Sequence, residues 1–254
     1  SSLRDWKLAN IVVQEYYCDV VRKMVELSLD RCVENVELFA KRDEKAIGYL
    51  MEGLILVGIA MSFVGNSRPA SGSEHHMSHF WELVSLMEGR KPSAHGIQVG
   101  IATLITSRLA ESLIDMDIDF SAIMRQIEAI DQDRWEQNIH RVYKKAAPEI
   151  IKLNKKPVDR AVKERIERVE TIRDKWDAIV SVIKEAPNAT RIEELFKMVG
   201  ENIPTSPRDI GFDSEIVEDT ILYAKEIRQR YTILRLLWDI GLLEASKREG
   251  NLCT

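Results

Sequence analysis

The sequence predicts an all-α protein, a multi-helix bundle, and three observations lead to that prediction. Apolar residues recur at spacings of three and four along most of the 254 residues, as in Val20, Met24 and Leu27. No run alternates β-branched and aromatic residues, and neither Asn-Gly nor Asp-Gly occurs as a hairpin turn. A glycine-rich turn between a strand and a helix is also absent, so these residues show no dinucleotide site.

The apolar periodicity and the breaks between periodic segments predict ten helices. In chain order we expect them over residues 6–39, 43–64, 73–87, 95–113, 121–130, 131–153, 158–185, 191–199, 213–228 and 232–245. Ser71 or Ser73 is expected to cap the third helix and Ser93 the fourth. Residues 200–212 hold prolines and glycines and should be irregular. The second helix is apolar on most sides in its middle, which predicts a place at the centre of the bundle.

Composition excludes several classes of protein. The net charge is −5 and there is no basic excess, which argues against a nucleic-acid surface. Three cysteines without a CxxC pair indicate neither a thiolate zinc site nor a disulfide framework and suit a reducing cytoplasm. The first residues lack the apolar segment of a signal peptide. The longest apolar stretch, residues 54–64, is short for a bilayer, so we expect no membrane span.

Four of the five histidines are clustered. His75, His76 and His79 fall within five positions, His95 follows, and only His140 lies elsewhere. On a helix His75 and His79 point the same way, the spacing that lets two imidazoles bind one zinc ion. Two imidazoles and a carboxylate would leave an open coordination position, as in a catalytic metal site. Histidines at this spacing also occur as ordinary surface or core residues, and spacing alone leaves both interpretations open.

Longer strings around the histidines resemble a known family. Residues 67–75 read Ser-Arg-Pro-Ala-Ser-Gly-Ser-Glu-His, residues 78–79 read Ser-His, and residues 95–100 read His-Gly-Ile-Gln-Val-Gly. These strings resemble the sn-glycerol-1-phosphate dehydrogenases, especially the AraM-type bacterial branch. The Asp-Trp segment at residues 5–9 and the C-terminal helices over residues 227–243 are similar to the same family, so the resemblance covers most of the chain.

The resemblance implies a fold and a domain organisation. The family belongs with the iron-type alcohol dehydrogenases and dehydroquinate synthases, which have an N-terminal α/β nucleotide-binding domain and a C-terminal helical domain. Residues 1–254 would be the helical metal- and substrate-binding domain, without the nucleotide-binding domain. The family's aspartate ligand precedes the Asp-Trp segment, so the resemblance does not identify Asp5 with that ligand.

The resemblance also implies an activity, cofactors and ligands. The family reduces dihydroxyacetone phosphate to sn-glycerol 1-phosphate with NADH or NADPH and a divalent metal, zinc or nickel, in phospholipid biosynthesis, and a homodimer is expected. The metal ligands carried over are His75 and His95, and the archaeal pattern favours His75 over His76. His79 would be the catalytic residue near the metal, where it could orient substrate, pass a proton or simply pack.

A phosphorylated substrate calls for a cation and hydrogen-bond donors nearby. Asn66, Arg68 and Ser71 are the substrate-binding candidates, because they lie on the loop that leads into the histidine helix. Arg68 could instead pair with a local carboxylate such as Glu74. Glu74 itself could support His75 or lie at the surface.

Two other functions compete with this expectation. A glycerol dehydrogenase of the same fold would keep the site and change the substrate. A non-catalytic helical assembly module would keep the histidines without their chemistry. For this chain by itself we expect no dehydrogenase activity and weak metal binding.

Overall fold

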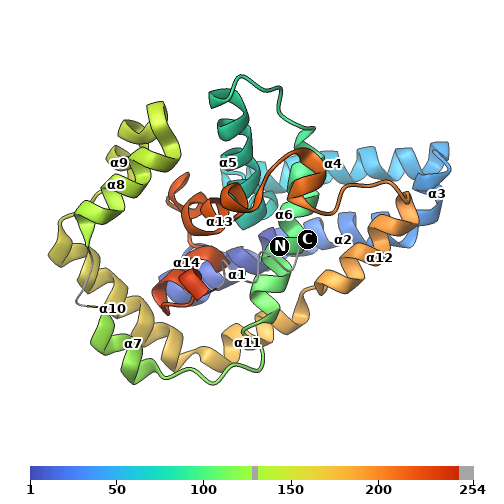
Figure 1. Cartoon of the computed structure of the whole chain (residues 1–254). Helices are drawn as coiled ribbons and strands as arrows, with labels where there is room; N and C mark the ends of the chain where they lie inside the picture. The colour runs from blue at the N-terminus through green and yellow to red at the C-terminus, as the bar shows by residue number, and fades with distance from the viewer. Residues whose placement is uncertain (128–130, 246–254) are drawn as a thin grey trace.

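The computed structural model describes residues 1–127 and 131–245, and across these residues it contains helices and no β-strand (Figure 1). The all-α prediction is therefore confirmed. The α-helices are α1 (Ser2–Val13), α2 (Asp19–Glu34), α3 (Val36–Ala40), α4 (Glu44–Val64), α5 (Ser73–Met87), α6 (His95–Glu111), α7 (Phe120–Gln126), α8 (Gln132–Tyr143), α9 (Ala147–Asn154), α10 (Val158–Asp174), α11 (Trp176–Glu185), α12 (Ala189–Val199), α13 (Ser214–Tyr223) and α14 (Ile233–Asp239). Short 3₁₀ helices are η1 (Arg68–Ala70), η2 (Lys144–Ala146), η3 (Pro207–Ile210) and η4 (Ala224–Glu226).

One large hydrophobic core joins elements that are far apart in the sequence. It contains buried side chains from α1, α5, α6, α8, α11, α13 and α14. Figure 1 shows α5 and α6 near the middle of the molecule, with α8 and α9 on one side and α2, α3, α4 and α12 on the other. Phe80 and Trp81 of α5 are buried in this core. His75 and His79 lie on the partly exposed face of α5.

The first predicted helix, 6–39, is wrong as a single element. The chain forms α1, α2 and α3 there, and α1 begins four residues earlier than expected. Gln14 ends α1 in the left-handed conformation, with φ 55°. The indole nitrogen of Trp6 donates a hydrogen bond to the carbonyl oxygen of Tyr16 at 2.7 Å, which fixes the chain after the break. The helix thus ends at a residue that is neither glycine nor proline, and this hydrogen bond holds the chain that follows it.

Three other long predicted helices are also interrupted. The range 131–153 breaks at Lys144, which has φ 47°, and continues through η2 into α9. The range 158–185 divides at Lys175 into α10 and α11. The range 213–228 becomes α13 followed by η4, and the last predicted helix is shortened to α14. Residues 200–212, expected to be irregular, include η3, and the predicted end of the helix 121–130 falls outside the described residues.

Helix α4 lies at the periphery, which corrects the expectation that it occupies the centre of the bundle. It packs mainly on α2, and its buried residues are the small ones, Ala46, Gly53 and Ala60. Eight large hydrophobic side chains of α4 are exposed, namely Ile47, Tyr49, Leu50, Met51, Leu54, Ile55, Ile59 and Phe63. In the described part of the chain, α4 is the one helix whose length and composition would suffice to cross a membrane, and 11% of its apolar window is buried.

Candidate metal centre

Carboxylates, and not the neighbouring serine side chains, accept hydrogen bonds from the backbone N–H groups at the start of the histidine helix α5. The N-cap is Gly72, so the expected cap by Ser71 or Ser73 is wrong. Instead the backbone N–H of Ser73 donates to Oδ2 of Asp5 at 2.7 Å, and that of Gly72 donates to Oε1 of Glu74 at 2.7 Å. Carboxylates at a helix N-terminus satisfy free N–H groups and interact favourably with the helix dipole. The start of the site is therefore tied to α1.

Glycine is required at position 72 by close approach of its neighbours. A Cβ there would lie 2.8 Å from Oδ2 of Asp5 and 2.9 Å from both Oε2 of Glu74 and Cα of Ser2. These distances are too short for non-bonded atoms, so any side chain would push α1 and the first turn of α5 apart. The glycine in the Ala-Ser-Gly-Ser-Glu-His string thus has a structural reason.

Helix α6 brings the fourth clustered histidine back to α5. It begins at His95 and its N-cap is Ala94, so the expected cap by Ser93 is not formed. The side-chain amide of Gln98 instead donates to the carbonyl oxygen of Ser93 at 3.0 Å. Helices α5 and α6 pack together, and Nδ1 of His95 lies 3.2 Å from Oγ of Ser78, so the first turn of α6 faces the middle of α5.

Three imidazoles converge where α5 and α6 meet. The ring centroids are 6.2 Å apart for His75 and His79, 5.3 Å for His75 and His95, and 5.6 Å for His79 and His95. All three rings are partly exposed, so the cluster is open to solvent on one side. His140, on α8, is exposed and does not take part. The predicted convergence of His75 and His95 is present in the structure.

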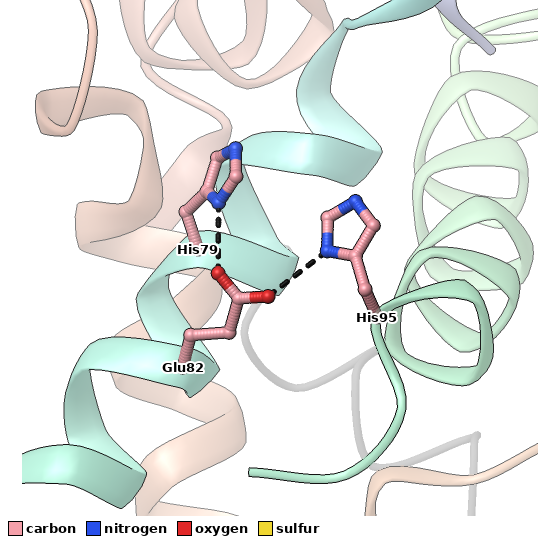
Figure 2. Close-up of side chains that lie close together, drawn as sticks. All are labelled: His79, Glu82 and His95. Atoms are coloured by element: carbon pink, nitrogen blue, oxygen red, sulfur yellow. Dashed lines mark hydrogen bonds and ion pairs between the residues drawn. The ribbon is translucent and has the colours of Figure 1, made fainter.

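Glu82 stands between two of these rings, and sequence reasoning missed it. Its Oε2 is 3.0 Å from Nδ1 of His79, and its Oε1 is 2.9 Å from Nδ1 of His95 (Figure 2). One candidate ligand atom from each of these three residues lies within 4.8 Å of the others. Partial burial favours a neutral carboxyl, but the hydrogen bonds from His79 and His95 outweigh it and lower the pKa of Glu82. Glu82 is three residues beyond His79, a spacing that places both on one helix face.

His75 has a carboxylate partner of its own. Its Nδ1 lies 2.8 Å from Oε1 of Glu74. Glu74 is buried, which would raise the pKa of its carboxyl, yet the hydrogen bond from His75 contributes to a pKa well below the ordinary range. The sequence left Glu74 open between supporting His75 and lying at the surface. The structure places it inside, against His75.

His76 points away from the cluster and into the protein. Its side chain is buried, and neither ring nitrogen has a hydrogen-bond partner among the described residues. Burial lowers the pKa of His76 to about 3, and the neighbouring charges of Arg68, Arg228 and Arg230 act in the same direction. Of the two adjacent histidines, His75 is therefore the one that faces His95 and the solvent.

The three predicted substrate-binding residues take different positions. Asn66 is exposed, and its Oδ1 accepts a hydrogen bond from the backbone N–H of Arg68 at 2.8 Å. Arg68 is 1% exposed and donates through Nη2 to the carbonyl oxygens of Asp5, at 3.0 Å, and Tyr231. Its Nε lies 2.9 Å from Oε1 of Glu15, so the ion-pair partner is Glu15 and not Glu74. Ser71 is buried, and its hydroxyl has no partner among the described residues.

A second arginine reaches the same loop from the C-terminal part of the chain. Arg230 donates through Nη1 to the carbonyl oxygen of Ser71 at 3.2 Å and through Nη2 to Oγ of Ser67 at 3.1 Å. Its side chain is partly exposed, in contrast to that of Arg68. No local sequence pattern indicates this contact, because more than 150 residues separate Arg230 from the loop.

The cluster has the chemistry of a divalent-metal site. Imidazole nitrogens bind zinc at about 2.0–2.1 Å, and the ring separations here suit rings that share one ion. Metal-bound imidazoles ordinarily donate their other N–H to a carboxylate or carbonyl group, and each of these rings has a carboxylate at Nδ1. Fold and site together define the class, a helical unit that carries an open histidine–carboxylate centre between two helices.

Comparisons with known proteins find relatives along nearly the whole chain. The chain is 30% identical to the glycerol-1-phosphate dehydrogenase [NAD(P)+] of Geobacillus thermodenitrificans over 96% of this chain and 51% of the relative. The protein of that name from Bacillus licheniformis is 27% identical over 98% of this chain and 49% of the relative. One from Korarchaeum cryptofilum is 39% identical over 43% of this chain and 35% of the relative. No family model matches the chain.

The chain is thus related along nearly its whole length to the glycerol-1-phosphate dehydrogenases, as the sequence strings indicated. It spans about half the length of the curated relatives it matches. With its helical architecture, that coverage is consistent with the C-terminal half of such an enzyme.

Proposed function

We propose that this chain, residues 1–254, is the helical metal- and substrate-binding domain of an NAD(P)-linked sn-glycerol-1-phosphate dehydrogenase. The convergence of His75, His79 and His95 on one open site carries the proposal. It agrees with the family to which the chain is related. The complete enzyme would reduce dihydroxyacetone phosphate to glycerol 1-phosphate, a step of phospholipid biosynthesis in the cytoplasm.

His75 and His95 are the proposed metal ligands, and the metal is zinc or nickel. Once bound, the cation would polarise the substrate's ketone as a Lewis acid. Both imidazoles must be neutral to coordinate, so metal affinity should fall in acid. His79 is proposed as the catalytic residue beside them, because its ring is partly exposed and lies 5.6 Å from that of His95.

The loop before α5 is proposed to bind the substrate's phosphate. Asn66 and Ser71 can offer polar groups, while Arg68 contributes positive charge from within the loop and donates to the carbonyl oxygens of Asp5 and Tyr231. Arg230 adds a partly exposed cation on the same loop. Two arginines converging on one loop favour a phosphorylated substrate over free glycerol.

The nicotinamide cofactor, NADH or NADPH, is proposed to be held by a nucleotide-binding domain that is not among these residues. This chain by itself should then be inactive. The direct experiment supplies, in trans, the part of the Geobacillus relative that this chain does not match, together with zinc or nickel, dihydroxyacetone phosphate and NADH. NADH oxidation by the reassembled pair is expected with wild-type chain and with His140→Ala, and is expected to be lost with His95→Ala.

A reassembled pair that oxidises no NADH with any metal would remove the dehydrogenase proposal. The reverse reaction tests the glycerol dehydrogenase alternative. If the reassembled pair oxidises glycerol at a rate comparable to that for glycerol 1-phosphate, that alternative is favoured. Both outcomes need proof of assembly, such as co-elution of the two halves.

An assembly role is favoured by one observation, the exposed apolar side chains of α4. We propose that this face pairs with a second copy of the chain to form a homodimer. Glu52, a charged residue on α4 beside these apolar side chains, is already paired with Arg31 at 2.9 Å. Charge pairing on this face therefore does not require a positively charged partner. A stripe along one helix can pair with itself across a twofold axis. Exposed apolar patches of this kind mark interaction surfaces.

A further inference from the structure

Within the described residues, the hydrogen bonds of the His79 and His95 rings involve Nδ1 and leave Nε2 without a partner. Glu82 contacts the Nδ1 atoms of His79 and His95, at 3.0 and 2.9 Å. Figure 2 shows that Nε2 of each ring lies on the side away from Glu82. A carboxylate only accepts hydrogen bonds, so each Nδ1 that contacts it must carry the proton. In a neutral imidazole, Nε2 then keeps its lone pair.

A second chain of contacts leads to the same tautomer for His95. The amide nitrogen of Gln98 donates to the carbonyl oxygen of Ser93 at 3.0 Å, which turns the amide oxygen toward Ser78. The hydroxyl of Ser78 donates to that oxygen at 3.2 Å. The hydroxyl's proton is thereby used, so its 3.2 Å contact with Nδ1 of His95 is one that it accepts. His95 is therefore an Nδ1–H donor on two independent grounds.

We propose that Glu82 is a positioning residue that holds His79 and His95 as Nδ1–H tautomers and aims both Nε2 atoms into the site. The part of this proposal that concerns metal affinity rests on the proposed function. Each carboxylate oxygen of Glu82 accepts from one imidazole, so in this role Glu82 acts through the two rings. Supporting hydrogen bonds of this type orient a ligating ring and raise its basicity.

Glu82→Gln is the sharpest variant, because it keeps the size of the side chain and removes one acceptor. In glutamine one of the two oxygens is replaced by an NH₂ donor, so only one of the two Nδ1–H groups keeps an acceptor where Glu82 now supplies one. His79 is the more sensitive ring, since Ser78 also supports His95. The matched control is Glu88→Gln at the end of α5, where the carboxylate pairs with Arg90 and touches no histidine.

The first measurement is the ¹⁵N spectrum of the histidine rings in the metal-free chain. Wild type and Glu88→Gln should show Nδ1–H for His79 and His95, and Glu82→Gln should convert His79 to a tautomer mixture. Nε2–H as the main form of both rings in the wild type would overturn the proposal. This readout needs no metal, so it stands even if the chain binds none, which would instead contradict the proposed function.

The second measurement is zinc affinity by chelator competition. Glu82→Gln should weaken binding about 10- to 100-fold without changing the stoichiometry, and Glu88→Gln should leave it unchanged. In the cadmium-loaded chain, ¹¹³Cd coupling is expected at Nε2 of His95. Coupling at Nδ1 would show that the metal displaces Glu82's hydrogen bonds, and wild-type affinity in Glu82→Gln would show that the carboxylate has no positioning role.

Discussion

The carboxylate of Asp5 accepts a hydrogen bond from the backbone N–H of Ser73 at 2.7 Å and so ties α1 to the first turn of the histidine helix. Its other oxygen accepts from the backbone N–H of Ile233 at 3.1 Å, at the start of α14. Asp5 is buried, and one side chain thereby serves the N-termini of two helices. It joins three segments that are separated by most of the chain.

Asp5→Asn should therefore destabilise the fold by about 1–3 kcal/mol, because an amide turns an N–H₂ group toward a buried donor. Urea unfolding monitored by circular dichroism measures this loss. The matched control is Asp19→Asn in the first turn of α2, where the carboxylate is exposed beside Arg22 and a change within about 0.5 kcal/mol is expected. Equal stability of the two variants would contradict the role given to Asp5.

Gly72→Ala should be destabilising by about 1–3 kcal/mol, the usual cost of forcing an extra group into a packed position. The new Cβ would meet Asp5, Glu74 and Ser2 at distances below 3 Å. Gly58→Ala is the opposite control, since nothing lies within 4 Å of a Cβ there and alanine favours a helix by about 0.5–1 kcal/mol. Thermal unfolding should thus shift down for one variant and up for the other. A shift in the same direction for both would count against the close contact.

Glu226 should make stability depend on acid pH. It is buried, which favours its neutral form, but Lys225 at 3.0 Å and Arg235 at 3.4 Å outweigh burial and lower its pKa from 4.5 to about 2. The unfolded chain binds this proton near pH 4.5 and the folded chain only near pH 2. The contribution of Glu226 to the free energy of unfolding is therefore fully present above pH 4.5 and is lost as the pH falls toward 2. This contribution is at most about 3 kcal/mol.

Urea unfolding of Glu226→Gln at pH 6 and at pH 3 checks this sign. The variant should lose less stability than the wild type between the two pH values, whereas Glu215→Gln, at an exposed carboxylate, should follow the wild type. A Glu226→Gln curve parallel to that of the wild type would show that this ion-pair cluster contributes no pH dependence.

Ile55→Lys should weaken self-association through α4. Ile55 is 61% exposed near the middle of the apolar stripe, and a lysine there would have to be desolvated when two copies pair. Sedimentation equilibrium should show a dimer for the wild type and a monomer for Ile55→Lys. Leu86→Lys, in the last turn of α5, is the control and should remain dimeric. A wild-type chain that is monomeric at every concentration would rule out this interface.

Local sequence patterns predicted the fold class and the histidine site, but not the tertiary contacts around them. His75 and His79 were predictable because helical spacing puts them on one face, and His95 because it opens the next helix. Glu82 could have been found by the same spacing from His79. The breaks at Gln14 and Lys144 were not predictable, since neither residue is a glycine or follows a proline. The peripheral place of α4 depends on its packing against α2, which its own composition does not reveal.

Zinc titration of the purified chain tests the central claim most directly. One ion should bind to the wild type and to His140→Ala, since His140 lies on α8 away from the cluster. His75→Ala and His95→Ala should each weaken binding by more than the roughly 10- to 100-fold that losing a supporting hydrogen bond costs. Tight, stoichiometric zinc binding that survives the loss of both His75 and His95 would contradict the account.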